Sequence, residues 1–289
     1  PTNSPVENKS QPILINEQVA TAQKVLDSRD ELHLSDHEET LLTKLLQIGT
    51  SAGGARAKAV VAVNKNRTEI RSGQVDVPDG FEHYLLKFDG VQEHRAGKEI
   101  FGDPKGYGVM EYVYYLMATK AGINMSKCEL LREANNGRAH FMTKRFDRNG
   151  NFKYHVLSLC GMAHADFKSP GAYSYEELLS TARQLRLSNK QQEQIYRRMV
   201  FNVIARNQDD HTKNWAFMVN DNYKWELAPA YDIAWSYKQD SAWVNAHQLT
   251  IAGKRDNFTR DDLLSVAALI TGVSSKKAKD IIDKTITIV

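Results

Sequence analysis

The sequence predicts an α+β protein in which a small, sheet-rich N-terminal lobe precedes a larger helical C-terminal lobe. The strand-like runs KAVVAVN, HYLLKFD and AHFMTKRF all lie before about Phe146, around a single helical stretch, GVMEYVYYLMATKAG. Helix-start signals dominate the half of the chain that follows. A length of 289 residues allows two modest lobes as readily as one large core. We therefore expect an N-terminal lobe over residues 31–146 and a C-terminal lobe over residues 147–289.

The N-terminal lobe is preceded by a polar stretch and opens with a predicted helix. The first residues, PTNSPVENKSQP, are polar and show no periodicity, so residues 1–30 are expected to form a flexible tail. In the segment SDHEETLLTKLLQI that follows, Ser35 and Glu38 have the spacing of a capping box. This pattern predicts that a helix starts there.

Two helices and a hairpin are predicted in the C-terminal lobe. SYEELLSTARQL carries Ser174 and Glu177 at capping-box spacing. SNKQQEQIYRRMVFNVIAR has Ser188 as its N-cap and apolar residues at helical spacing, so this helix should be broadly buried and end just before Asn207. The runs WAFMVN and YKWELA flank residues 221–222, which predicts a β-hairpin.

Composition excludes several classes of protein. The hydrophobic share of 42% and the charged share of 25% are those of a folded globular chain. A net charge of +3, with basic residues spread along the chain, does not predict nucleic-acid binding by itself. Cys128 and Cys160 offer neither a disulfide framework nor a CxxC metal motif. Since no apolar run approaches the ~20 residues of a membrane span and no signal segment opens the chain, we expect a soluble cytoplasmic protein without membrane contact.

The stretch ARNQDDHTKNWAFMVNDNYKWELAPAYDIAW places acidic residues on both sides of the predicted hairpin. Asp209 and Asn214 are five positions apart, directly after a predicted buried helix, and Asp232 follows the hairpin. In protein kinases an Asp at the first position accepts the proton of the substrate hydroxyl, while the Asn and the later Asp hold Mg²⁺. The spacing therefore predicts Asp209 as a catalytic base and Asn214 and Asp232 as metal ligands.

The same residues allow other interpretations. Asp and Asn residues commonly cap helices and turns, so each of these side chains taken singly could be structural. His211 is either a base that titrates near neutral pH or a brace of the loop, and Lys213 either neutralises phosphate or is only solvated. A metal-dependent hydrolase is the main rival, because acidic and histidine side chains also ligate divalent metals. Its candidate ligands are Asp209, Asp210, His211 and Asp232.

Two features earlier in the chain could bind phosphate. GTSAGGARAK, residues 49–58, is a small-residue loop whose backbone amides could approach phosphates, although it matches no phosphate-loop motif and also reads as a plain tight turn. Lys87 ends the run HYLLK, where kinases place the lysine that contacts ATP, and Glu111 is its expected ion-pair partner. A lysine at a strand edge is more often only solvated, so the order of the elements along the chain is what favours the kinase interpretation.

The motifs SAGGARAK, YLLKFD, MEYVYYLMATKAGI, TKRFDR, NQDDHTKN and LAPAYDIA resemble, in this order, those of the HipA-like serine/threonine kinases, the toxins of bacterial toxin–antitoxin modules. The resemblance spans residues 49–236. It implies a divergent two-lobed protein-kinase fold that phosphorylates protein serines or threonines with Mg-ATP, among them those of aminoacyl-tRNA synthetases. It also implies a small helix-turn-helix antitoxin as partner, through which DNA would be bound indirectly.

The resemblance also assigns roles to individual residues. It implies Asp209 as the catalytic base, Asn214 and Asp232 as ligands of Mg²⁺, and Ser51 as a site of self-phosphorylation. The positions that it implies for ATP binding are Ser51, Gly53, Gly54, Ala55, Arg56, Lys58, Lys87, Glu111, Lys144, Arg145, Phe146, His211, Lys213 and Tyr231.

Two departures from the family pattern qualify these assignments. The usual QxK of the phosphate loop reads Arg56-Ala57-Lys58 here. The N-terminal subdomain of longer members, which helps to contact the antitoxin, is not recognisable, so we expect a short member or a partner protein that supplies it. A small-molecule kinase with the same site and a catalytically silent, kinase-like regulatory subunit stay open as alternatives. Intact Asp209, Asn214, Asp232 and Lys87 speak against the silent subunit.

Overall fold

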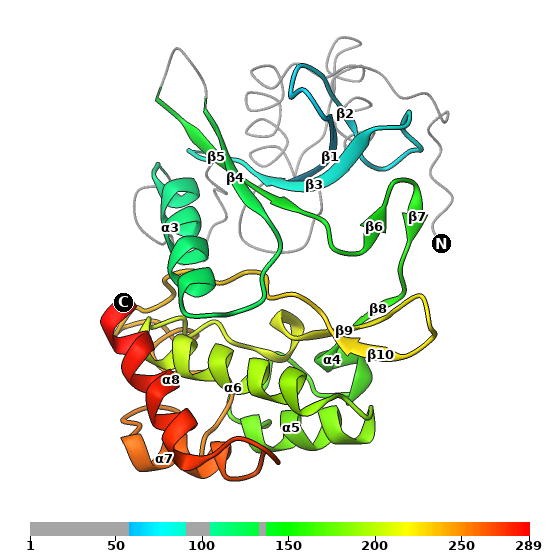
Figure 1. Cartoon of the computed structure of the whole chain (residues 1–289). Coiled ribbons are helices and arrows are strands. Elements are labelled where there is room, and N and C mark those ends of the chain that lie inside the picture. The colour runs from blue at the N-terminus through cyan, green and yellow to red at the C-terminus, as the bar shows by residue number, and fades with distance from the viewer. Residues whose placement is uncertain (1–57, 91–104, 133–136) are drawn as a thin grey trace. The chain divides into compact units, whose positions relative to one another are not determined.

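The computed structural model describes residues 58–90, 105–132 and 137–289 (Figure 1). These residues form two compact units. The first contains the described residues up to Tyr112 together with Lys127–Lys153, and the second contains Val113–Ser126 and Tyr154–Val289. Strands dominate the first unit and helices the second, which is the α+β composition predicted from the sequence.

The first unit is built on an antiparallel sheet with the strand order β2-β1-β3-β5-β4. Its strands are β1 (Lys58–Asn64), β2 (Ile70–Ser72), β3 (Phe81–Lys87), β4 (Cys128–Arg132) and β5 (Ala139–Lys144). A separate short hairpin follows, formed by β6 (Arg148–Asn149) and β7 (Phe152–Lys153). β1, β3 and β5 coincide closely with the runs predicted as strands, because their β-branched and aromatic residues fit a pleated, half-buried surface.

The two faces of this sheet carry different side chains. Val61 and Val63 of β1 pack with Tyr84 and Leu86 of β3 in a small apolar core. Because successive residues of a strand point to opposite faces, Lys87 lies on the face away from this core. The strand pattern thus delivers a lysine to the second face of the sheet.

Helix α3 (Tyr107–Lys120) starts against the sheet of the first unit. The carboxylate of Asp89, just after β3, accepts hydrogen bonds from the amides of Gly106 at 2.9 Å and Gly108 at 3.4 Å. A negative charge at this end of a helix satisfies its first amides and is favoured by the helix dipole. Gly108 has no room for a side chain, since a Cβ there would lie 1.9 Å from the carbonyl oxygen of Ala139. These contacts fix the start of α3 against Asp89 and Ala139.

The second unit is mainly helical. Its helices are α4 (Leu159–Met162), α5 (Tyr175–Gln184), α6 (Asn189–Ile204), α7 (Arg260–Ala267) and α8 (Ser275–Ile288). A three-stranded antiparallel sheet, β10-β9-β8, completes it, with β8 (Val156–Ser158), β9 (Ala216–Val219) and β10 (Trp225–Leu227). α8 packs against α6 and α7 (Figure 1). Side chains of α5, α6, α7 and α8 fill one apolar core.

The two helix starts predicted in the C-terminal lobe from capping residues are confirmed. The Ser174 side chain accepts from the amide of Glu177, whose side chain accepts in return from the amide of Ser174. Ser188 caps α6 in the same reciprocal way with Gln191. Such caps satisfy amides that the first helical turn leaves without partners.

The predicted hairpin is also present, with Phe217 of β9 opposite Leu227 of β10. Asn220 and Lys224 close its turn through a backbone hydrogen bond of 2.9 Å. β2, β4, the β6–β7 hairpin and β8 were not expected. They are short: β8 depends on pairing with β9, which lies far along the chain, whereas β2, β4 and the β6–β7 hairpin pair with neighbouring segments.

Some predictions fall on residues that the structure does not describe. The tail over residues 1–30, the helix after Ser35 and the small-residue loop before Lys58 lie outside the described ranges. Within those ranges, none of the helices combines the length and the apolar character that a membrane crossing requires.

Candidate functional site

Helix α6 ends in a turn that leads to Asp209. The amide of Asn207 donates to the carbonyl of Asn202 at 2.9 Å, and Arg206 has a left-handed backbone with φ of 52°. This closure is the Schellman type of helix end, which turns the chain sharply away from the helix axis. Asn207 also forms a parallel bridge with Ser236. The backbone that precedes Asp209 is therefore held from both sides.

Asn214 lies at the end of a 3₁₀ turn, Thr212–Asn214, that follows Asp209. The hydroxyl of Thr212 donates to the carbonyl of Ala165 at 2.9 Å and ties this turn to the chain before α5. The amide nitrogen of the Asn214 side chain donates to the backbone carbonyl of Asp209 at 2.8 Å. Because the nitrogen is used in this way, the side-chain oxygen of Asn214 is the atom available to a ligand.

Asp232 is fixed by its neighbours in an uncommon backbone conformation. Its φ is 55°, in the left-handed region that Asp and Asn tolerate better than most residues. The amide of Ala230 donates to the carbonyl of Asn124 at 2.8 Å. The hydroxyl of Tyr231 donates to the carbonyl of Lys213 at 2.6 Å. Outliers of this kind persist where the surrounding structure determines them, often at functional sites.

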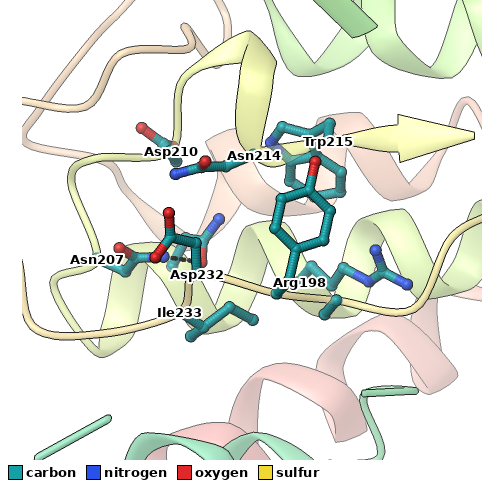
Figure 2. Close-up of a pocket in the computed structure, with 10 residues that line it drawn as sticks. Arg198, Asn207, Asp210, Asn214, Trp215, Asp232 and Ile233 are labelled. Atoms are coloured by element: carbon teal, nitrogen blue, oxygen red, sulfur yellow. Dashed lines mark hydrogen bonds between the residues drawn. The ribbon is translucent and has the colours of Figure 1, made fainter. Parts of the chain in front are cut away.

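Asn214 and Asp232 border the same small cavity, which has a volume of about 10 Å³ (Figure 2). That volume suits one water molecule or a small ion. All the residues that line the cavity belong to the second unit. They are Arg198, Asn202, Asn207, Asp210, Asn214, Trp215, Ala230, Tyr231, Asp232 and Ile233.

The donors at this cavity fit Mg²⁺. Asn214 offers an amide oxygen and Asp232 a carboxylate, the hard oxygen ligands that Mg²⁺ prefers. Across the described ranges, no group of three or more His, Cys, Asp and Glu side chains is placed to hold a metal ion. One or two protein oxygens can suffice for Mg²⁺, since it keeps several waters and is usually shared with substrate phosphates.

Asp209 is not among the lining residues, but its backbone carbonyl binds the side chain of Asn214, and 35% of the Asp209 side chain is exposed. The indole N–H of Trp243 donates to its Oδ1 at 2.6 Å, and Nε2 of His211 lies 3.7 Å from the same oxygen. Burial raises the pKa of Asp209 above its ordinary value, and the charges of Asp232 and Asp210 raise it further. His211 and the hydrogen bond from Trp243 act to lower this pKa but do not outweigh the other effects. A carboxylate with a raised pKa and an accessible oxygen is suited to accept a proton.

Asp210 has a different environment, although it is the next residue. It is 1% exposed, and its carboxylate accepts from the hydroxyl of Tyr175 at 2.6 Å and the amide of Gln248 at 2.7 Å. Nδ1 of His247 lies 2.9 Å from its Oδ2. Burial alone would raise the pKa of Asp210, but His247 and these hydrogen bonds outweigh it and hold the pKa below its ordinary value.

This use of Asp210 weighs against the metal-hydrolase interpretation. Three groups of the protein already bind its two oxygens, which leaves Asp210 little capacity for a metal ion. Its role is to hold segments of the second unit together.

In the first unit, Lys87 and Glu111 form the expected ion pair. Nζ of Lys87 lies 2.5 Å from Oε1 of Glu111, and the two side chains are only 8% and 5% exposed. Nζ of Lys87 also lies 5.8 Å from the centre of the Phe141 ring. Lys58 pairs with Lys87 across β1 and β3 at the start of β1. The ion pair between Lys87 and Glu111 therefore fixes a buried positive charge at the end of β3.

The other described candidates are mostly engaged within the protein. Lys144 forms an ion pair with Glu82. The guanidinium of Arg145 donates twice to Asp147, at 2.8 and 2.5 Å, and Phe146 is partly buried. These contacts account for the positions of Lys144 and Arg145 without a ligand.

His211 and Lys213 lie near Phe167. The His211 ring is 5.6 Å from the Phe167 ring and 6.1 Å from the Trp243 ring. Nζ of Lys213 lies 3.6 Å from the centre of the Phe167 ring, within the range of a cation–π contact. Ser51, Gly53, Gly54, Ala55 and Arg56 lie outside the described residues.

Sequence reasoning missed Trp243 altogether. It contacts Asp209 from 34 residues further along the chain, and no motif marks it. Only the folded structure shows the contact.

Comparison with models of protein families gives a match. A model of the HipA-like C-terminal domain matches residues 50–289. The chain belongs to this family. Comparison of the HipA-like chain with curated protein sequences finds no match.

Two solved structures resemble the HipA-like chain. HipA of Shewanella oneidensis MR-1, determined in a complex with HipB and its operator DNA, matches with a TM-score of 0.61 and 15% identity. The match covers 99% of this chain but only 65% of that HipA chain. The proinflammatory kinase CtkA of Helicobacter pylori matches with a TM-score of 0.46 and 14% identity, over 83% of this chain and 86% of CtkA. The likeness to Shewanella HipA confirms the predicted fold class.

Proposed function

We propose that this HipA-like protein is an Mg-ATP-dependent kinase that phosphorylates serine or threonine hydroxyls of proteins. The observation that carries the proposal is the arrangement of three side chains in the second unit. Asp209 is a partly exposed carboxylate with a raised pKa, and two oxygen donors lie near it: the Asn214 side chain binds its backbone carbonyl, and the charge of Asp232 contributes to the raised pKa. General-base chemistry and phosphate-bound Mg²⁺ require this combination.

In this proposal Asp209 accepts the proton of the acceptor hydroxyl as its oxygen bonds to the γ-phosphorus of ATP. The bond from the γ-phosphorus to the bridging oxygen breaks, and ADP leaves with the electron pair. The products are a phosphoserine or phosphothreonine, ADP and a proton. Mg²⁺, when bound, would neutralise the phosphate charge, and Asn214 and Asp232 would hold it through their oxygens.

Lys87 supplies a fixed positive charge for the phosphates of ATP. Its ion pair with Glu111 holds the ammonium group in one position, so little side-chain freedom is lost on binding. By resemblance, Lys58, residues 144–146, His211, Lys213 and Tyr231 also contact the nucleotide, together with the loop from Ser51 to Arg56.

We further propose that the protein acts as the toxin of a toxin–antitoxin pair, with a translation protein such as an aminoacyl-tRNA synthetase as target. The Shewanella HipA structure, a complex with HipB and operator DNA, supports a DNA-binding partner of the same kind. Self-phosphorylation at Ser51 would add about −1.5 to −2 charges near the ATP phosphates and switch the kinase off.

Phosphate transfer from γ-³²P-ATP tests this function. The protein is incubated with Mg²⁺ and labelled ATP, alone, with a lysate of its host and with a pool of metabolites. We expect label on serine or threonine of proteins, and peptide mapping then shows whether Ser51 carries it. Label only in a metabolite would indicate a small-molecule kinase, and no transfer would indicate a catalytically silent subunit.

A further inference from the structure

Trp243 reaches the candidate base from a distant part of the second unit. It lies in the chain between β10 and α7, and its indole Nε1 is 2.6 Å from Oδ1 of Asp209. Nε2 of His211 lies 3.7 Å from the same oxygen, beyond hydrogen-bonding distance. The indole N–H can only donate, so it binds the charged carboxylate without competing for a proton.

The segment that carries Trp243, residues 241–248, is held in place by buried contacts. Ser241 is 1% exposed, and its hydroxyl accepts from the amides of Trp243 at 3.1 Å and Val244 at 3.2 Å. The side-chain nitrogen of Gln248 lies 2.5 Å from the carbonyl oxygen of Trp243. The backbone that carries the indole is therefore held in place.

The same segment also binds Asp210. The amide of Gln248 donates to Oδ1 of Asp210 at 2.7 Å, and Nδ1 of His247 lies 2.9 Å from Oδ2. Residues 241–248 thus contact both consecutive aspartates, one through Trp243 and the other through His247 and Gln248. The buried contact with Asp210 anchors the segment, and the contact with Asp209 is made at its partly exposed end.

A free carboxylate rotates readily about its last side-chain bond, since that torsion has broad minima. The Trp243 N–H removes this freedom by binding Oδ1, which leaves Oδ2 as the oxygen for an acceptor hydroxyl. We propose that Trp243 is a positioning residue of phosphoryl transfer, which acts by fixing the orientation of the Asp209 carboxylate. This inference rests on the proposed kinase function.

The test removes the N–H donor and keeps the ring. Trp243 is replaced by 3-benzothienylalanine, which has sulfur in place of the indole N–H, and in a second variant by phenylalanine, Trp243→Phe. We expect kcat to fall roughly ten- to a hundredfold, the effect of one hydrogen bond to a charged group, with KM for ATP nearly unchanged. Trp243 does not border the cavity of Asn214 and Asp232, so ATP binding should persist.

Two controls separate positioning from folding. Trp235→Phe changes another tryptophan, 45% exposed, and should leave kcat and the thermal midpoint at the wild-type values. In the Asp209→Asn background, Trp243→Phe should cause no further loss of rate, because the carboxylate that it orients is gone.

Nuclear magnetic resonance gives a readout that does not depend on activity. The four tryptophans give four indole N–H signals, and the Trp243 signal is the one missing from Trp243→Phe. This signal should move upfield in Asp209→Asn, while that of Trp235 stays in place. An unmoved Trp243 signal would contradict the contact.

The outcomes distinguish this inference from the function on which it rests. If wild-type protein transfers phosphate and both Trp243 variants match its kcat, the positioning role is wrong and the kinase function stands. A rise in KM for ATP, or a fall in thermal midpoint large enough to explain the loss of kcat, would also overturn the positioning role. Wild-type protein without phosphate transfer would overturn both.

Discussion

Asp209 and Asp210 are consecutive residues whose carboxylates have opposite environments. Asp210 is 1% exposed and binds Tyr175, His247 and Gln248, whereas 35% of the Asp209 side chain is exposed. Their pKa values are shifted in opposite directions, upward for Asp209 and downward for Asp210. The pair therefore combines an anchor of the fold with a candidate base.

Asp210→Asn should destabilise the second unit. The amide keeps the shape of the side chain but cannot accept from Tyr175, His247 and Gln248 with the strength of a carboxylate, and it adds a donor without a partner. We expect a loss of about 2 to 4 kcal/mol, the range for disrupting a buried charged network. Urea denaturation measures it.

Asp221→Asn is the matched control, since Asp221 is exposed in the turn between β9 and β10. Its stability should stay within about 0.5 kcal/mol of wild type. Equal stability of the two variants would show that Asp210 is not an anchor.

Asp210 should also make stability depend on pH in the acid range. Its folded-state pKa is held below the ordinary value of 3.8, so its contribution is complete above that pH and is lost as pH falls through the folded-state pKa. Asp210→Asn lacks this contribution. Urea midpoints measured from neutral pH to below pH 3.8 should therefore fall less steeply for Asp210→Asn than for wild type, and parallel curves would contradict the prediction.

Removing only one partner of the Lys87–Glu111 pair should destabilise the first unit. Lys87→Met leaves the Glu111 carboxylate buried without its cation, which costs about 3 to 5 kcal/mol in comparable cases. The double variant Lys87→Met with Glu111→Leu removes both charges and should recover much of that loss. Urea denaturation of the single and double variants gives the coupling between them.

If the stability losses of Lys87→Met and Glu111→Leu alone simply add up to the loss in the double variant, the ion pair is not the source of the effect. Lys127→Met serves as a control, because 65% of the Lys127 side chain is exposed beside Glu129. Exposed pairs of this kind contribute little to stability, so this variant should behave like wild type.

Asp232→Asn should make nucleotide binding insensitive to Mg²⁺. Asparagine tolerates the left-handed backbone at this position, with φ of 55°, so the change removes a charged ligand and leaves the turn intact. Titrations of fluorescent ATP with and without Mg²⁺ measure the effect. Asp240→Asn, an exposed aspartate nearby in the chain, should keep the wild-type dependence. If Asp232→Asn keeps it too, Asp232 is a structural turn residue.

The elements that the sequence predicts well are those with local causes. Ser174 with Glu177, and Ser188, mark helix starts because a cap involves residues only three positions apart. β1 follows from its own β-branched residues. β4 was missed because CELLR has little strand preference of its own, and it becomes a strand by pairing Leu130 with Phe141 of β5.

The candidate site shows the same division. Asp209, Asn214 and Asp232 stand out from spacing within one stretch, and the pairing of Lys87 with Glu111 followed from the order of elements. Trp243 could not be predicted, since its contact depends on how residues 241–248 fold back, and the anchoring by Asp210 depends on Tyr175 and His247 in the same way. The catalytic and metal-binding roles stay predictions.

The most direct test of the kinase function is phosphate transfer by Asp209→Asn beside wild type. The change keeps the size of the side chain and removes the base, so Mg-ATP binding should persist while transfer of ³²P from γ-labelled ATP to protein falls by a factor of a hundred or more, at the lower end of what a general base contributes. Transfer by Asp209→Asn at a near-normal rate, with wild-type protein active in the same assay, would contradict the assignment of Asp209 as the base.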